Sequence, residues 1–173
     1  MYKAYNMEIL GKRAVVINLN KERAGLDGVH YIHILDIEDV KMVSKLKETL
    51  NYMGENDLIT IILSSGKVLI KGSQNHKGLE SLLDSLEASK KDGDILKSLN
   101  VTDEIIDELK VMCDKFVVIL YTDSLDSNEL METVDKINKK VVSFNIVGYG
   151  NDYDRDNLLN ITGNSQFGVL VHS

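Results

Sequence analysis

FVVILYTD, residues 116–123, is the most informative stretch of this sequence. An unbroken apolar run of this length, rich in β-branched residues, is typical of a strand buried on both faces of a parallel sheet. YIHILD at 31–36 and LITIIL at 58–63 have the same character. Parallel strands end at the same edge of a sheet, and ligands bind beyond that edge. Asp36 and Asp123, which each end one of these runs, are therefore predicted to share a site.

Segments with apolar residues at helical spacing separate these strands. We expect a helix over 39–53 that Gly54 terminates, one around Leu79 to Leu86, one capped by Thr102 and one through Leu130 to Ile137. Residues 67–70 are expected to pair back as an antiparallel edge strand. Further strands are expected at 141–147 and 167–171, with a short helix carrying Leu158 and Leu159 between them. This alternation predicts a Rossmann-like three-layer α/β/α sandwich, with a mostly parallel sheet and one antiparallel edge strand.

The N-terminal segment has a pattern of short strands and no amphipathic helix, unlike the rest of the sequence. Two short extended candidates, 5–10 and 14–19, flank a turn at Gly11 and Lys12 and predict a β-hairpin. We therefore divide the chain into a hairpin extension with its loop, residues 1–28, and a main domain, residues 29–173.

Composition narrows the functional class. The 173 residues suit one main domain, and the net charge of −7 comes without a Lys/Arg-rich block. Nucleic acids and anionic membranes both require clustered positive charge, so neither is an expected partner. The sequence has no apolar run long enough to span a membrane and no signal peptide pattern. One cysteine, Cys113, cannot form an intrachain disulfide and indicates a reducing compartment. The expected location is the cytoplasm.

The order of these segments resembles the von Willebrand factor A (vWA) domain over about residues 13–173. The resemblance rests on KLKETL at 45–50, ENDLITIIL at 55–63, VVILYTDS at 117–124, SFNIVGYG at 143–150, DNLL at 156–159 and FGVLV at 167–171. The resemblance implies that the domain binds another protein and does not catalyse a reaction. Such domains inside cells tend to serve in multiprotein assemblies.

The same resemblance locates a site. The family holds a metal ion with Asp-x-Ser-x-Ser after the first strand, a Thr before the third helix and the Asp of Thr-Asp-Gly. In this chain Asp36 and Asp123 match, but Glu38 and Val40 replace the serines, residues 73–78 hold no Thr, and Ser124 replaces the glycine. We therefore expect a degenerate metal site, no cofactor, and protein recognition through a set of strand-end residues. That set is Asp36, Glu38, Ser73, His76, Lys77, Asp123, Ser124 and Asp126.

Two alternatives use the same carboxylates. In the first, Asp36, Glu38 and Asp123 hold Mg²⁺ or Ca²⁺, hard cations that prefer oxygen ligands, and the domain adheres through the metal. The second is a Mg²⁺-dependent phosphatase, because DIEDV at 36–40 resembles the nucleophile motif of haloacid-dehalogenase-type enzymes. Ser64 would then be the second motif, with Asp123 and Asp126 as metal ligands. Without a metal, backbone N–H groups, water, His76 or Lys77 would satisfy the carboxylates.

Other reactive side chains are interpreted as structural. The four histidines lack zinc-like spacing with Cys113, and His30 and His33 flank one predicted strand. One feature of the resemblance concerns the C-terminus, because vWA domains usually follow the last strand with one more helix, whereas this sequence ends at Ser173. A longer parent chain, the N-terminal hairpin, or a partner or second copy would then cover that flank of the sheet. We expect self-association or a stable complex.

Overall fold

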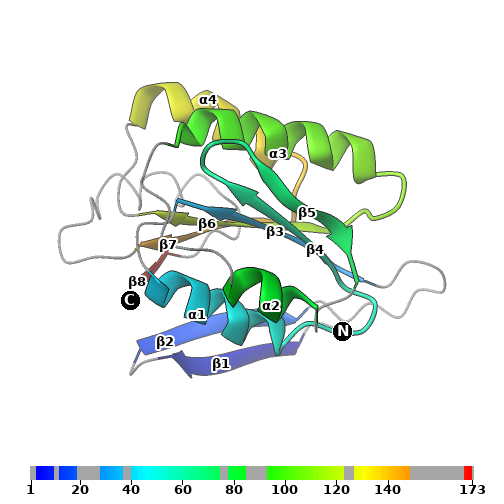
Figure 1. Ribbon diagram of the computed structural model, residues 1–173, viewed down its shortest axis with the longest axis vertical. Helices are drawn as coiled ribbons and strands as arrows, with labels where there is room; N and C mark the ends of the chain where they lie inside the picture. Colours follow the sequence, from blue (N-terminus) through cyan, green and yellow to red (C-terminus); the bar gives the residue numbers. More distant parts are fainter. Residues whose placement is uncertain are drawn as a thin grey trace.

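The computed structural model describes residues 3–9, 12–18, 28–36, 40–74, 78–84, 93–122, 127–148 and 170–172. Figure 1 shows the arrangement of their helices and strands. The strands are β1 (Lys3–Ile9), β2 (Lys12–Asn18), β3 (His30–Leu35), β4 (Leu58–Leu63), β5 (Val68–Ser73), β6 (Phe116–Thr122), β7 (Ser143–Gly148) and β8 (Leu170–His172). The helices are α1 (Val40–Leu50), α2 (Leu79–Asp84), α3 (Ile95–Leu109) and α4 (Ser127–Asn138).

One six-stranded sheet forms the middle layer, in the order β5-β4-β3-β6-β7-β8. Each neighbouring pair is parallel except β4–β5, which is antiparallel. The predicted α/β sandwich with one antiparallel edge strand is thereby confirmed. The chain order places β3, the first strand of this sheet, between β4 and β6, so the strand order reverses direction at β3.

Helices cover both faces of the sheet, with α3 and α4 on one side and α1 and α2 on the other (Figure 1). Alternate residues of each strand point to opposite faces. On β3, Ile32 and Ile34 belong to the core cluster beneath α3 and α4. Leu35, one residue further, belongs to the cluster beneath α1 and α2. Both halves of the core therefore depend on the same central strands.

Helix α3 begins earlier than the sequence indicated. Its N-cap is Asp94, whose carboxylate accepts from the N–H of Lys97, and the predicted cap, Thr102, lies in the middle of the helix. The prediction was wrong because Thr102 satisfies its hydroxyl within the helix, donating to the carbonyl oxygen of Ser98 at 2.8 Å. Leu99 is fully buried and continues the apolar stripe upstream, so packing extends the helix beyond the capping signal.

The end of α1 also differs from the prediction. The helix ends at Leu50, and Gly54 is not its terminating residue. Instead the Gly54 N–H donates to one carboxylate oxygen of Asp57 at 2.7 Å. The other oxygen of Asp57 accepts from the N–H of Val29 at 2.8 Å, which joins this turn to the start of β3.

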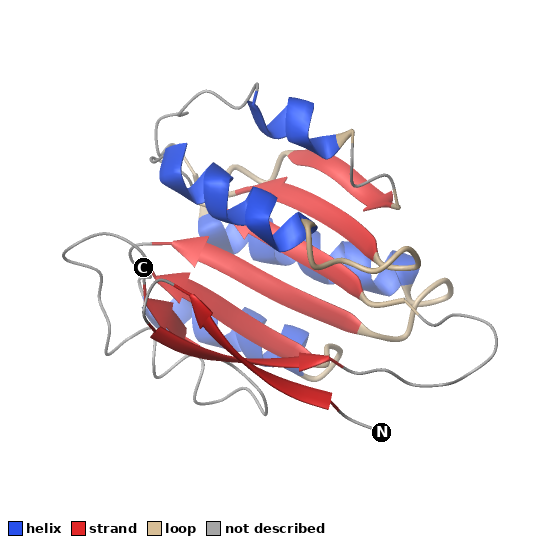
Figure 2. Cartoon of the chain, turned by 90° about the horizontal axis from the view of Figure 1, so that it is seen from below, coloured by secondary structure: helices blue, strands red, loops and turns tan. Residues whose placement is uncertain are grey.

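The N-terminal hairpin is confirmed, because β1 and β2 pair antiparallel as a separate two-stranded sheet. It lies on the same side of the main sheet as α1 and α2 in Figure 1, and Figure 2 views the molecule from that side. At the other end of the chain, β8 pairs parallel with β7. The expected short helix at Leu158 and Leu159 lies outside the described residues, and so does the first part of the expected last strand.

In the part of the chain that the structure describes, no helix combines the length and apolar character required to cross a membrane.

Leu99 provides a test of the packing under α3. Its side chain is fully buried in the core cluster, whereas Val111 is 80% exposed. Replacing Leu99 with Ala is expected to lower the free energy of unfolding by about 2–5 kcal/mol through lost burial and a cavity. Val111→Ala should change it by less than about 0.5 kcal/mol. Urea denaturation of both variants measures the difference, and equal losses would show that α3 does not pack as described.

Candidate functional site

Three strand ends form one polar row at the C-terminal edge of the sheet. Leu35 of β3 pairs with Leu63 of β4 and with Tyr121 of β6. The next residue on each strand is therefore Ser64, Asp36 or Thr122, and the three are level with one another. All three are buried, with 7%, 0% and 0% of their surface exposed. A carboxylate thus lies between two hydroxyl side chains at the point where the strand order reverses.

Backbone and side-chain hydrogen bonds fix this row. The Ser64 N–H donates to the Leu35 carbonyl oxygen at 2.9 Å, and the Asp36 N–H donates to the Tyr121 carbonyl oxygen at 3.0 Å. The Thr122 hydroxyl donates to Oδ2 of Asp36 at 2.9 Å. A buried carboxylate is costly unless hydrogen bonds compensate it. Thr122 supplies one such bond, so it positions Asp36 at the strand end.

The segment before α3 packs against the same edge. A Cβ built on Gly93 would lie 1.7 Å from Oγ of Ser64, so a larger side chain at 93 would displace the chain. Gly93 directly precedes Asp94, the N-cap of α3. The N-terminus of α3 is therefore held beside Ser64.

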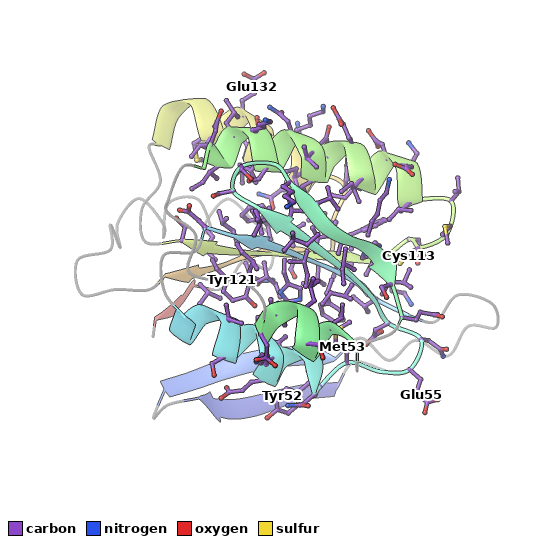
Figure 3. The ribbon with its side chains drawn as sticks, in the orientation of Figure 1. Tyr52, Met53, Glu55, Cys113, Tyr121 and Glu132 are labelled. Atoms are coloured by element: carbon purple, nitrogen blue, oxygen red, sulfur yellow. The ribbon has the colours of Figure 1, made fainter. Side chains whose placement is uncertain are left out.

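A second buried network lies below this row, on the α1 and α2 side of the sheet. The hydroxyl of Tyr121 lies 3.1 Å from Nδ1 of His33 and also hydrogen-bonds Thr49 of α1. Figure 3 shows Tyr121 between the sheet and α1. Burial lowers the pKa of His33 to about 3, with a further contribution from His30, and burial raises the pKa of Tyr121. Both side chains are therefore neutral near pH 7 and link α1 to β3 and β6.

His30 and Cys113 are both buried and make contacts within the fold. His30 Nε2 lies 2.7 Å from the hydroxyl oxygen of Thr60, which also accepts from the N–H of Gly72. Burial lowers the pKa of His30 to about 4. The Cys113 thiol lies 3.3 Å from the carbonyl oxygen of Lys115, and burial raises its pKa, which disfavours the reactive thiolate.

The predicted site residues divide into three groups. Asp36 lies at the C-terminal edge, as expected. Ser73 does not: it pairs with Ile59 near the start of β4, about 16 Å along the strand from Ser64. The prediction for Ser73 was wrong because the antiparallel direction of β5 returns the chain to the opposite edge. Glu38, His76, Lys77, Asp123, Ser124 and Asp126 lie outside the described residues.

Thr122 was not among the predicted site residues, although it stands within the motif that located Asp123. The two-residue periodicity of a strand would have indicated that Thr122 belongs to the site. Thr122 follows Val118 and Leu120 at two-residue spacing, as Asp36 follows Ile32 and Ile34. Residues at this spacing share a face of the sheet. Because β3 and β6 pair residue for residue, Thr122 therefore lies beside Asp36.

The sequence resemblance predicts a departure from the hydroxyl-rich metal site of the vWA family. The positions of the two serines hold Glu38 and Val40, and a valine side chain offers no donor. Within the described residues, no group of three or more His, Cys, Asp and Glu side chains could hold a metal ion. Asp36 contributes one carboxylate, and one of its oxygens already accepts from Thr122.

Comparison with solved structures identifies the class of fold. BatB from Bacteroides thetaiotaomicron superposes with a TM-score of 0.70 at 13% identity, over 84% of this chain and 90% of that chain. A von Willebrand factor type A protein from Catenulispora acidiphila gives 0.68 at 15% identity, over 84% and 38%. Manganese-loaded TRAP protein from Plasmodium vivax gives 0.65 at 15% identity, over 84% and 68%.

These similarities show that the chain has a vWA-like fold, as its sequence resemblance implied. At 13–15% identity they establish the architecture alone. No protein-family model matches the sequence, and no curated protein matches it.

The bond between Thr122 and Asp36 is testable by an isosteric change. Thr122→Val removes one donor from a buried carboxylate and is expected to cost about 1–3 kcal/mol of unfolding free energy. Thr102→Val is the control, because that hydroxyl is equally buried but donates only to a helix carbonyl oxygen. The control should lose less than about 1 kcal/mol. Similar losses in the two variants would contradict the positioning role of Thr122.

His33 makes stability depend on pH. Its folded pKa is about 3 against an ordinary 6.5, so the unfolded chain binds a proton that the folded chain does not between these values. Stability is complete above pH 6.5 and falls as pH is lowered toward 3. The slope is about 1.4 kcal/mol per pH unit for one such group.

His33→Phe should therefore reduce the loss of stability between pH 7 and pH 5 by roughly 2 kcal/mol. Tyr121→Phe removes the hydroxyl next to His33 but no titrating imidazole, so its pH dependence should match that of the unmodified protein. Denaturation curves at the two pH values give the comparison. A His33→Phe variant with unchanged pH dependence would show that His33 is not held neutral by the fold.

Proposed function

We propose that this chain is a non-catalytic protein-binding domain of a cytoplasmic assembly, and that its partner docks at the C-terminal edge of the sheet. The observation that carries this proposal is the position of Asp36 and Thr122 at the point where the strand order reverses. Ligands of open α/β sheets bind at such points. The buried single cysteine and the net charge of −7 are consistent with a soluble partner in a reducing compartment.

The chemistry of the edge favours a basic partner. The chain leaving Asp36 carries Glu38 and Asp39, and the chain leaving Thr122 carries Asp123 and Asp126. Because both acidic segments directly follow the strand ends at Asp36 and Thr122, we expect them to give that edge a negative potential. Complementary charge steers association and selects partners, so a lysine- or arginine-bearing protein surface fits best.

Binding without a metal fits this donor set better than the family's metal-mediated mode. Mg²⁺ demands near-octahedral oxygen coordination, and the two serines and the Thr of the family's site have no counterpart in this sequence. A metal-dependent mode is kept as a second candidate because the manganese-loaded TRAP protein shares the fold and Asp36 is a buried carboxylate at the matching edge.

Charge-reversing substitutions test whether the partner docks at the proposed edge or elsewhere on the surface. We expect Glu38→Lys combined with Asp126→Lys to reduce capture of a stoichiometric protein partner from the native source by about tenfold. Glu55→Lys is the matched control, because Glu55 is exposed and lies at the opposite end of the molecule from Tyr121 (Figure 3). Quantitative mass spectrometry of the captured proteins provides the measurement.

Retention of the partner by the double variant, or its loss in Glu55→Lys, would refute docking at this edge. Repeating the capture with EDTA tests the metal, since EDTA-sensitive capture that Mn²⁺ restores would replace our proposal with the second candidate. A phosphatase assay with p-nitrophenyl phosphate and Mg²⁺ tests catalysis. Turnover that Asp36→Asn abolishes would establish an enzyme instead.

A further inference from the structure

Strand β5 lies at one end of the sheet and has a neighbouring strand on one side only. Within the described residues it pairs with β4 and with no other strand. Figure 1 shows it as the strand nearest the viewer. The backbone N–H and C=O groups on the outer side of an edge strand form a template for pairing with another chain. A straight, uncharged strand at this position would therefore promote self-association.

Two β-bulges interrupt the pairing of β5 with β4. The paired residues are Ser73 with Ile59, Ile70 with Ile61 and Val68 with Ile62. From the first pair to the second the chain advances three residues along β5 but two along β4, and from the second pair to the third it advances two and one. Each interval thus contains one extra β5 residue. Such a residue bends and twists the strand, so the outer side of β5 is not a regular ladder.

Buried polar contacts hold the first bulge, between Ile70 and Ser73. Gly72 has a φ of +59°, a left-handed conformation that glycine adopts readily. Its N–H donates to the hydroxyl oxygen of Thr60 at 3.0 Å, and Nε2 of His30 lies 2.7 Å from the same oxygen. Thr60 and His30 are fully buried. The Gly72 N–H is therefore bonded to a side chain inside the molecule.

Exposed lysines accompany the bulges. Lys67 directly precedes β5, Lys71 lies within it, and both are exposed. Lys71 also contacts Glu108 of α3. An antiparallel pair of β5 strands centred on Leu69 would place Lys67 of one copy opposite Lys71 of the other. Like charges directly opposite each other destabilise a strand pair, and lysines on an edge strand disfavour the addition of another strand.

We propose that the two bulges and the two lysines close the β5 edge to strand addition, so that copies of this chain do not associate through it. His30, Thr60 and Gly72 hold the first bulge, and the lysine charges oppose a second β5 strand. The self-association expected from the sequence is thereby confined to other surfaces. This inference concerns a different edge of the sheet from that of Asp36 and does not depend on the proposed function.

Hydrogen exchange of the unmodified full chain tests the closed edge directly. NMR measures the exchange rates of the backbone amides of residues 68–73 at low micromolar and at millimolar protein concentration. We expect these rates to be the same at both concentrations, even if other surfaces associate. Amides of β5 that become protected as the concentration rises would overturn the proposal, because they would show that strands pair at this edge.

A variant that straightens and neutralises the edge provides a second measurement. Deletion of Gly72 combined with Lys67→Thr and Lys71→Thr removes one bulge and both charges, and should raise the association constant in sedimentation experiments by about tenfold or more. Lys110→Thr combined with Lys139→Thr is the control, because it removes the same charge at exposed positions outside β5 and should leave association unchanged.

An equal rise in the test variant and the control would assign the effect to net charge and contradict the proposal. A test variant that keeps the circular dichroism spectrum of the folded chain but does not associate more strongly would also overturn it. Should the deletion prevent folding, Lys67→Thr with Lys71→Thr alone is compared with the same control. The exchange rates of the unmodified chain decide independently of any variant.

Discussion

The in-register pairing of β3 with both β4 and β6 is the constraint on which the site depends. Leu35 is level with Leu63 on one side and with Tyr121 on the other. Backbone hydrogen bonds extend this alignment by one residue at each strand end, so Asp36 lies between two hydroxyl side chains. A shift of one residue in either pair would turn every side chain of a strand to the opposite face. Such a shift in the β3–β6 pair would remove the Thr122 hydroxyl from the buried carboxylate.

The same alternation builds two different layers. Beneath α3 and α4 the strands present large side chains that are fully buried, such as Phe116 and Phe144. Asp103 of α3 also contacts Lys136 of α4 at 2.5 Å and Lys140, which follows the end of α4, at 2.6 Å. Burial by itself raises the pKa of Asp103, but the hydrogen bonds from the lysines outweigh it and lower the pKa below the usual value. The opposite layer consists of shorter helices and is joined to the sheet by the His33–Tyr121–Thr49 network.

The hydrogen bond from Thr122 holds the Asp36 carboxylate at the strand end. Our proposal assigns the contact with a partner to this edge, through charge.

Several local predictions succeeded because they depended on adjacent residues. The strand at 58–63 was predicted with the bounds that the structure has, since an unbroken apolar run between turn residues contains its own limits. Two predicted helix boundaries were wrong. Asp94, not Thr102, caps α3, and α1 ends at Leu50, while the Gly54 N–H donates to Asp57 in the turn that follows. Ser73 failed because the direction of β5 reversed its position relative to Asp36.

The sequence by itself determined the alternation of buried strands and amphipathic helices, the class of fold and the placement of Asp36 at a strand end. Each of these follows from hydrophobic periodicity, which is a property of neighbouring residues. Only the tertiary structure decided that Thr122 bonds Asp36, that Gly93 packs against Ser64 and that Tyr121 links His33 to α1. These contacts join residues that are far apart in the chain, and they exist only once strand register brings those residues together.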